Sequence, residues 1–168
     1  MCINTRVSRF AGLALLLFSA AAQAVPPIQQ WTLANGARVY FVETHELPIV
    51  QLRVLFDAGS AREPSGKEGL ARLTVRMLRE GAGPLDANQI AATFEDLGAE
   101  LGGEASGEMA ELSLRSLAER KLRAPAVEVL RQMLLAPTFP EDGFRRERTR
   151  SLVGLQKALQ SPGEVAGR

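Results

Sequence analysis

Hydrophobic and polar residues change their spacing several times along the chain, and each change marks an expected element of secondary structure. Residues 31–33 and 38–42 are short apolar runs on either side of Asn35-Gly36, a pair that readily adopts the positive φ angles of a tight turn. They predict a β-hairpin. Residues 49–56 alternate, which predicts a third strand with one face in the core, that of Val50, Leu52, Val54 and Phe56.

Beyond residue 67 the apolar positions recur at intervals typical of a helix. A first helix is expected from Glu68 until Gly81. A second opens at Asp86, which forms a capping-box pattern with Gln89, and closes at Gly98. Two longer helices are expected at residues 122–135 and 140–160. In the last one, the side chains expected in the core are Phe144, Leu152, Leu155 and Leu159.

Between the second and third helices, residues 100–105 and 108–117 predict another hairpin around Ser106-Gly107. Its expected core contacts are Met109, Leu112, Leu114 and Leu117. Strands and helices thus occur in blocks rather than in strict alternation. This order predicts an α+β fold with a largely antiparallel sheet packed with helices.

The last eight residues begin with the pattern of a helix start. Ser161 supplies a hydroxyl cap, Pro162 takes the first helical position, and Glu164 can reach back to the cap. Only four residues follow Glu164. We therefore expect the sequence to be the N-terminal piece of a longer domain, truncated at its C-terminal end.

Residues 1–24 have the pattern of a secretory signal peptide. Arg6 and Arg9 precede an apolar run, and Ala22-Gln23-Ala24 is the small-x-small pattern that a signal peptidase accepts. The run ends before Pro26-Pro27 and is shorter than the roughly 20 apolar residues of a membrane-spanning helix. We expect export, to the periplasm or outside the cell, with residues 25–168 as the mature domain and no membrane span in it.

Charge and cysteine content exclude several classes of function. The chain has 20 basic and 19 acidic side chains, and removal of residues 1–24 would leave a net charge of −1. This balance disfavours nucleic-acid binding. The only cysteine is Cys2, so the mature domain has no disulfide, no thiol nucleophile and no cysteine-based zinc site.

Few residues suggest chemistry on their own. His45, the only histidine, precedes Pro48 in a turn and has no partner at metal-ligand spacing, so we expect an exposed loop histidine. The motifs of nucleotide-binding loops and of the serine-hydrolase elbow are absent. Basic residues cluster around Glu147 but are interleaved with acidic ones on a predicted helix, which indicates a solvated face rather than a binding site. They are Arg145, Arg146, Arg148 and Arg150.

Several short motifs occur in a distinctive order. They are Leu33-Ala34-Asn35-Gly36-Ala37-Arg38-Val39, Phe56-Asp57-Ala58-Gly59-Ser60-Ala61-Arg62-Glu63-Pro64, Gly69-Leu70-Ala71, residues 87–97, Leu101-Gly102-Gly103 and Pro137-Thr138-Phe139-Pro140. From about Trp31 to Gly167 this order resembles the N-terminal half of a peptidase domain in the pitrilysin (insulinase) family of zinc peptidases. The resemblance implies the fold of that domain.

In active members of that family, Gly-Leu-Ala leads into the motif His-x-x-Glu-His, in which two histidines hold zinc and the glutamate activates water. The corresponding positions here are Arg72, Val75 and Arg76, and the third ligand, a glutamate on the later long helix, aligns with Val153. Guanidinium groups stay protonated and repel a cation, and Val75 cannot take a proton from water. The resemblance therefore implies a degenerate site with no catalytic residue, metal ligand or cofactor in this chain.

Three hypotheses follow from the resemblance. The leading one is a non-catalytic subunit that forms a heterodimer with a zinc-bearing subunit and helps to form the peptide-binding chamber, where Arg72 and Arg76 bind a peptide carboxylate. The second is a zinc metalloendopeptidase, acting in proteolysis, whose active site lies outside this segment. The third is a protein-binding scaffold with the same fold. For the two arginines, the alternative is that they are solvated or paired within the protein.

Overall fold

The structure is a computed structural model that describes residues 26–160. The chain divides into two units, residues 1–47 and 48–168, which are described separately. The expected signal peptide at residues 1–24 and the expected helix start at residues 161–164 lie outside the described residues.

The first unit contains the predicted hairpin. Strand β1 (Ile28–Thr32) pairs antiparallel with β2 (Arg38–Val42), and the turn between them has Gly36 at a φ of 85°. The prediction placed the first strand at residues 31–33, but the strand begins earlier. Gln29 and Gln30 join the ladder opposite Phe41 and Tyr40, because backbone pairing does not require an apolar side chain.

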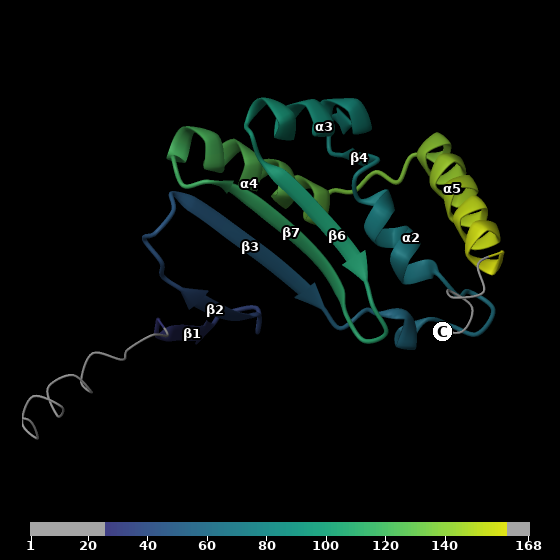
Figure 1. The fold of residues 1–168 in the computed structure, drawn as a ribbon, viewed down its shortest axis with the longest axis horizontal. Helices are drawn as coiled ribbons and strands as arrows, with labels where there is room; N and C mark the ends of the chain where they lie inside the picture. The colour runs from purple at the N-terminus through teal and green to yellow at the C-terminus, as the bar shows by residue number, and fades with distance from the viewer. Residues whose placement is uncertain (1–25, 161–168) are drawn as a thin grey trace, which may run out of the picture. The chain divides into compact units, whose positions relative to one another are not determined.

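The second unit is built on a three-stranded antiparallel sheet in the order β3-β7-β6 (Figure 1). Its strands, β3 (Ile49–Phe56), β6 (Glu100–Ala105) and β7 (Ala110–Leu117), confirm the predicted ones. Leu112 and Leu114 of the central strand are 1% and 2% exposed, whereas Leu52 and Phe56 keep 38% and 42% of their surface. The predicted burial of the β3 face is therefore only partly right, because β3 is an edge strand.

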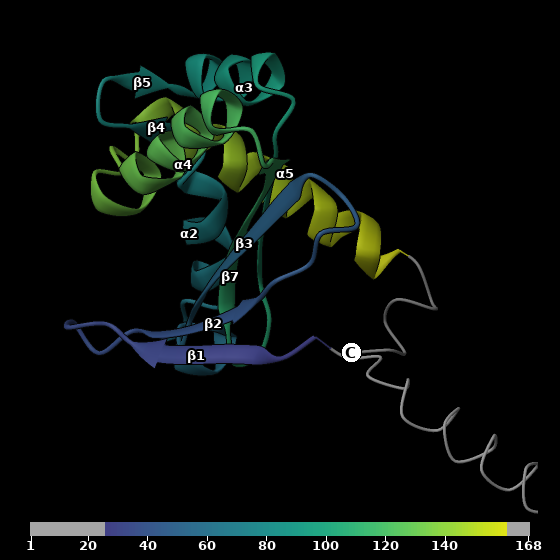
Figure 2. The same ribbon diagram turned by 90° about the vertical axis from the view of Figure 1, so that its left-hand side faces the viewer.

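Helices α2 (Leu70–Met77) and α4 (Arg120–Leu135) lie on one face of this sheet (Figure 2). Helix α3 (Ala87–Asp96) packs against α4 and begins with the predicted capping box, in which Gln89 N donates to Asp86 Oδ1 at 2.9 Å and Asp86 N donates to Gln89 Oε1 at 3.0 Å. The sheet and these helices share one core, whose largest enclosed side chains are Leu112, Leu114, Leu130 and Met133.

The first helix of this unit is shorter than predicted. It ends at Met77 instead of continuing to Gly81, because Gly81–Ala82 forms a short strand, β4, that pairs with β5 (Leu85–Asp86). Thr138 N donates to Gly81 O at 3.1 Å, so this segment is also tied to the chain that follows α4. Strands of two residues have no periodic pattern, which explains why the sequence did not predict them.

The last helix, α5 (Glu141–Leu159), turns a different face inward than predicted. Its four apolar side chains expected in the core, Phe144, Leu152, Leu155 and Leu159, are 39–59% exposed. The residues that are buried are Gly143 and Glu147. The apolar pattern was misleading here because α5 packs on α2 through small and polar side chains. Within residues 26–160, no helix combines the length and the apolar character needed to cross a membrane.

Candidate functional site

Helix α2 carries three of the four positions that correspond to the zinc motif, and it lies between β6 and α5 (Figure 1). The helix begins after Gly69, whose φ of 95° favours glycine. Its first turn is held by Glu63, whose carboxylate accepts hydrogen bonds from Gly69 N and Ala71 N, both at 2.8 Å. The motif Gly-Leu-Ala thus marks a helix start that a preceding loop fixes in place.

Val75 is part of the core. It is 5% exposed and lies against β6 at Gly103, where an added Cβ atom would come within 2.9 Å of Val75 Cγ1 and 3.0 Å of Leu112 Cδ2. The glycine in the sheet therefore makes room for the side chain on the helix. An isopropyl group in this place has no atom that can bind a metal or accept a proton.

Arg76 contacts two residues of α5. Its Nη1 atom donates to Ser151 Oγ at 3.2 Å and lies 3.9 Å from Glu147 Oε2. Arg72, one turn earlier on the same helix, is exposed. The structure thus places Arg76 in contacts within the protein and leaves the side chain of Arg72 at the surface.

Val153 does not join these residues. It is 45% exposed and follows Glu147 by six positions, which turns it about 120° around the helix from the face that packs on α2. His45 lies in the first unit with its side chain 85% exposed and its Nε2 atom 3.3 Å from Glu43, so the expected exposed loop histidine is confirmed.

This donor set does not fit zinc, which prefers thiolate, imidazole and carboxylate ligands in tetrahedral sites. Two of the four aligned positions are guanidinium groups and two are valines. In the described part of the chain, no three His, Cys, Asp or Glu side chains are grouped so that they could hold a metal ion. We therefore derive no metal-dependent step for this chain.

Glu147 is the residue of this region that the sequence analysis misjudged. The arginine-rich segment was interpreted as a solvated face, and its arginines are exposed, but Glu147 is only 5% exposed. Its carboxylate accepts a hydrogen bond from Arg150 and faces Arg76 across the helix interface. The spacing of Gly143, Glu147 and Ser151, four residues apart on one helix face, was the signal that could have revealed it.

Two further arginines support the strands beside α2. Arg79 donates a hydrogen bond to Leu101 O of the edge strand β6, and partial burial lowers the pKa of this guanidinium below its ordinary value. Arg53 binds Glu111 with two parallel hydrogen bonds, which hold the pKa of the Glu111 carboxyl below its ordinary value. The Arg53 guanidinium and the Glu111 carboxylate therefore stay charged at neutral pH and act as a fixed ion pair.

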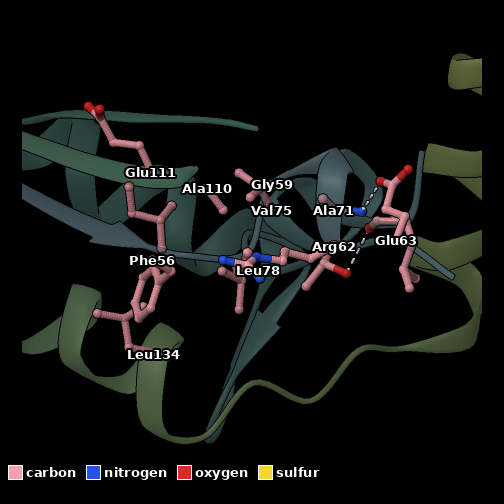
Figure 3. A pocket seen from close by; sticks show the side chains of 14 residues that line it. Phe56, Gly59, Arg62, Glu63, Ala71, Val75, Leu78, Ala110, Glu111 and Leu134 are labelled. Atoms are coloured by element: carbon pink, nitrogen blue, oxygen red, sulfur yellow. Dashed lines mark hydrogen bonds between the residues drawn. The ribbon is translucent and has the colours of Figure 1, made fainter. Parts of the chain in front are cut away.

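A pocket of about 400 Å³ lies beside α2, which lines it with Ala71 and Val75 among other residues (Figure 3). Its apolar lining includes Phe56, Val75, Leu78 and Leu134. The charged groups at its rim are already bonded within the protein, since Arg62 pairs with Asp57 and Glu63 holds the start of α2. No catalytic arrangement of these groups follows, and the pocket is an apolar concavity beside the degenerate motif.

The geometry defines an α+β domain in which α2 packs on α5, with no metal-binding side chain at the four aligned positions. Residues 38–166 match the family model described as Insulinase (Peptidase family M16). The chain belongs to this family, and the resemblance to the pitrilysin (insulinase) peptidases is confirmed.

Two of the chain's relatives are described as non-catalytic. The non-peptidase homolog YmxG of Helicobacter pylori is 27% identical over 117 residues, which are 70% of this chain and 27% of that protein. The crystal structure of a peptidase M16 inactive domain from Pseudomonas fluorescens is 41% identical, with a TM-score of 0.79 over 83% of this chain and 34% of that one. A protease structure from Helicobacter pylori, 21% identical with a TM-score of 0.66 over 74% of this chain and 30% of that one, shares the fold. The chain spans about a third or less of the length of each of these relatives.

Proposed function

We propose that this chain is part of a non-catalytic subunit that pairs with a zinc-bearing peptidase subunit of the same family and helps to form the peptide-binding chamber. The observation that carries the proposal is Val75, a core side chain at the position where the family resemblance calls for the glutamate that activates water. The fold around this position is kept although its donor atoms are gone. Relatives described as a non-peptidase and as an inactive domain support the non-catalytic part of this proposal.

Export of this subunit belongs to the same proposal. The pattern of residues 1–24 supports passage through the secretory pathway, after which the subunit would meet its partner in the periplasm or outside the cell. The mature domain has nearly equal numbers of acidic and basic side chains, so the partner is recognised through local patches rather than through net charge.

The decisive experiment is affinity purification of the full-length, chromosomally tagged protein from the cell envelope, followed by mass spectrometry and zinc analysis. We expect a stoichiometric partner that carries His-x-x-Glu-His, with zinc and peptide hydrolysis found only in the complex. Recovery of the protein alone, without zinc, would overturn the pairing and favour the scaffold hypothesis. Zinc bound to the full-length protein without a partner would instead favour the metalloendopeptidase hypothesis.

Arg72 is the better of the two arginines for a contact with substrate. Arg76 already faces Glu147 and Ser151, whereas the guanidinium of Arg72 is exposed and suited to bind a peptide carboxylate with two hydrogen bonds. Within the complex, we expect Arg72→Ala to raise KM for peptides with an acidic side chain or a C-terminal carboxylate by about tenfold, with kcat little changed.

The matched control is Arg148→Ala, which removes an exposed arginine from α5. The contact is excluded if both variants change KM equally, or if Arg72→Ala has the same effect on a neutral peptide with a blocked C-terminus. Either result would leave Arg72 as a solvated helix residue.

A further inference from the structure

Helices α2 and α5 are joined by charges that cross in both directions. From the α2 side come Arg76 and Glu80, the latter in the turn after the helix, and from α5 come Arg146 and Glu147. Arg146 Nη2 lies 2.7 Å from Glu80 Oε2, and Arg76 Nη1 lies 3.9 Å from Glu147 Oε2. We call these four residues, together with Arg150, the charge junction.

The two carboxylates of the charge junction are enclosed, while the guanidinium groups are not. The side chains of Glu147 and Glu80 are 7% and 11% exposed, against 43–69% for Arg76, Arg146 and Arg150. A carboxylate removed from water is costly unless cations and hydrogen-bond donors surround it. Each carboxylate is therefore paired with an arginine of the opposite side of the interface, and Glu147 is also paired with Arg150 of its own helix.

Close packing at the beginning of α5 completes this arrangement. A Cβ atom added at Gly143 would lie 2.7 Å from Glu80 Oε2 and 2.9 Å from Glu80 Cβ. The absence of a side chain at position 143 is what allows Glu80 to enter the interface. Elsewhere on the same helix, a Cβ atom at Gly154 would meet nothing within 4 Å.

We propose that the charge junction fastens α5 to α2 through internal counterions, so that the packing of these two helices does not depend on zinc. The aligned positions of α2 offer no donor atom to the ion, and the contacts between α2 and α5 are made by the charge junction and the close packing at Gly143. The inference concerns the fold of this chain alone and holds with or without a partner subunit.

The test is hydrogen exchange of the α5 amides in the full-length protein, measured with and without EDTA. We expect EDTA to leave the exchange of α5 unchanged. Glu147→Gln should accelerate it at least tenfold, because the amide removes the charge that holds Arg76 and Arg150 while keeping the shape of the side chain. The matched control is Glu141→Gln on the same helix, whose pair with Arg145 is solvent-exposed on both sides and should have little effect.

Two alanine variants give a second, charge-neutral test. Gly143→Ala should accelerate α5 exchange by displacing Glu80, whereas Gly154→Ala should leave it unchanged or slow it, since alanine favours a helix. Faster exchange of α5 in EDTA, reversed by zinc, would overturn the proposal. So would equal exchange in Glu147→Gln and Glu141→Gln.

Discussion

Replacing Val75 by glutamate, the residue that the family motif has at this position, should destabilise the protein severely and should not create a catalytic base. Val75 is 5% exposed and lies against Gly103 and Leu112, neither of which has a polar side chain that could bind a carboxylate. Burying a charge in such a place costs about 3–5 kcal/mol. Urea unfolding of the full-length protein followed by circular dichroism measures the loss.

The pH dependence of this variant identifies the cause. Burial raises the pKa of the introduced carboxyl in the folded state, so the folded protein binds more protons than the unfolded one and stability falls as pH rises. We expect a smaller deficit at pH 5 than at pH 7. Thr74→Glu, one residue earlier and exposed, is the control and should change stability by less than about 0.5 kcal/mol. Equal losses in the two variants would show that Val75 is not in an apolar environment.

A second large effect is expected for Gly59→Ala, in the loop before α2. A Cβ atom at this position would lie 2.4 Å from Glu108 C and 2.5 Å from Met109 N, backbone atoms that cannot move aside as a side chain can. Gly59 N also donates to Glu108 O at 3.0 Å, so the loop is docked on the turn between β6 and β7. We expect a loss of about 3 kcal/mol in the free energy of unfolding.

The control for this variant is Gly107→Ala in the same turn, where a Cβ atom would meet nothing within 4 Å. We expect a change within about 0.5 kcal/mol, as for most surface substitutions. If Gly59→Ala unfolds at the same urea concentration as the wild type, the loop is not docked as described.

Local patterns predicted most of the elements because they depend on residues close in sequence. The strand predicted at residues 49–56 and the capping box of Asp86 and Gln89 both appear as expected. The motif that carried the family resemblance also has a physical reason at Gly59, where only glycine fits between two backbone segments. The strand and the capping box could be interpreted without knowing what lies across the fold, whereas the contact that requires glycine at position 59 could not.

Predictions of burial failed where the surroundings of a side chain are formed by a segment that is distant in sequence. The apolar side chains of α5 predicted a core-facing stripe, yet the helix turns Gly143 and Glu147 inward, because its neighbour supplies Arg76 and Glu80. The sequence located the aligned motif positions but could not show that Val75 is buried or that Arg76 faces Glu147. Both features depend on the packing of α2 against α5 and β6, and no pattern of neighbouring residues in the sequence shows which helices and strands pack together.

The close contact between Val75 and Gly103 also limits how this protein can change over evolutionary time. Installing the family's zinc motif at the aligned positions would need imidazole and carboxylate groups at several positions on two helices. The first carboxylate to enter at position 75 meets the core rather than an ion, and a change at Arg76 removes a cation from an enclosed Glu147. Each of these two substitutions is therefore expected to lower stability before zinc could bind at the aligned positions.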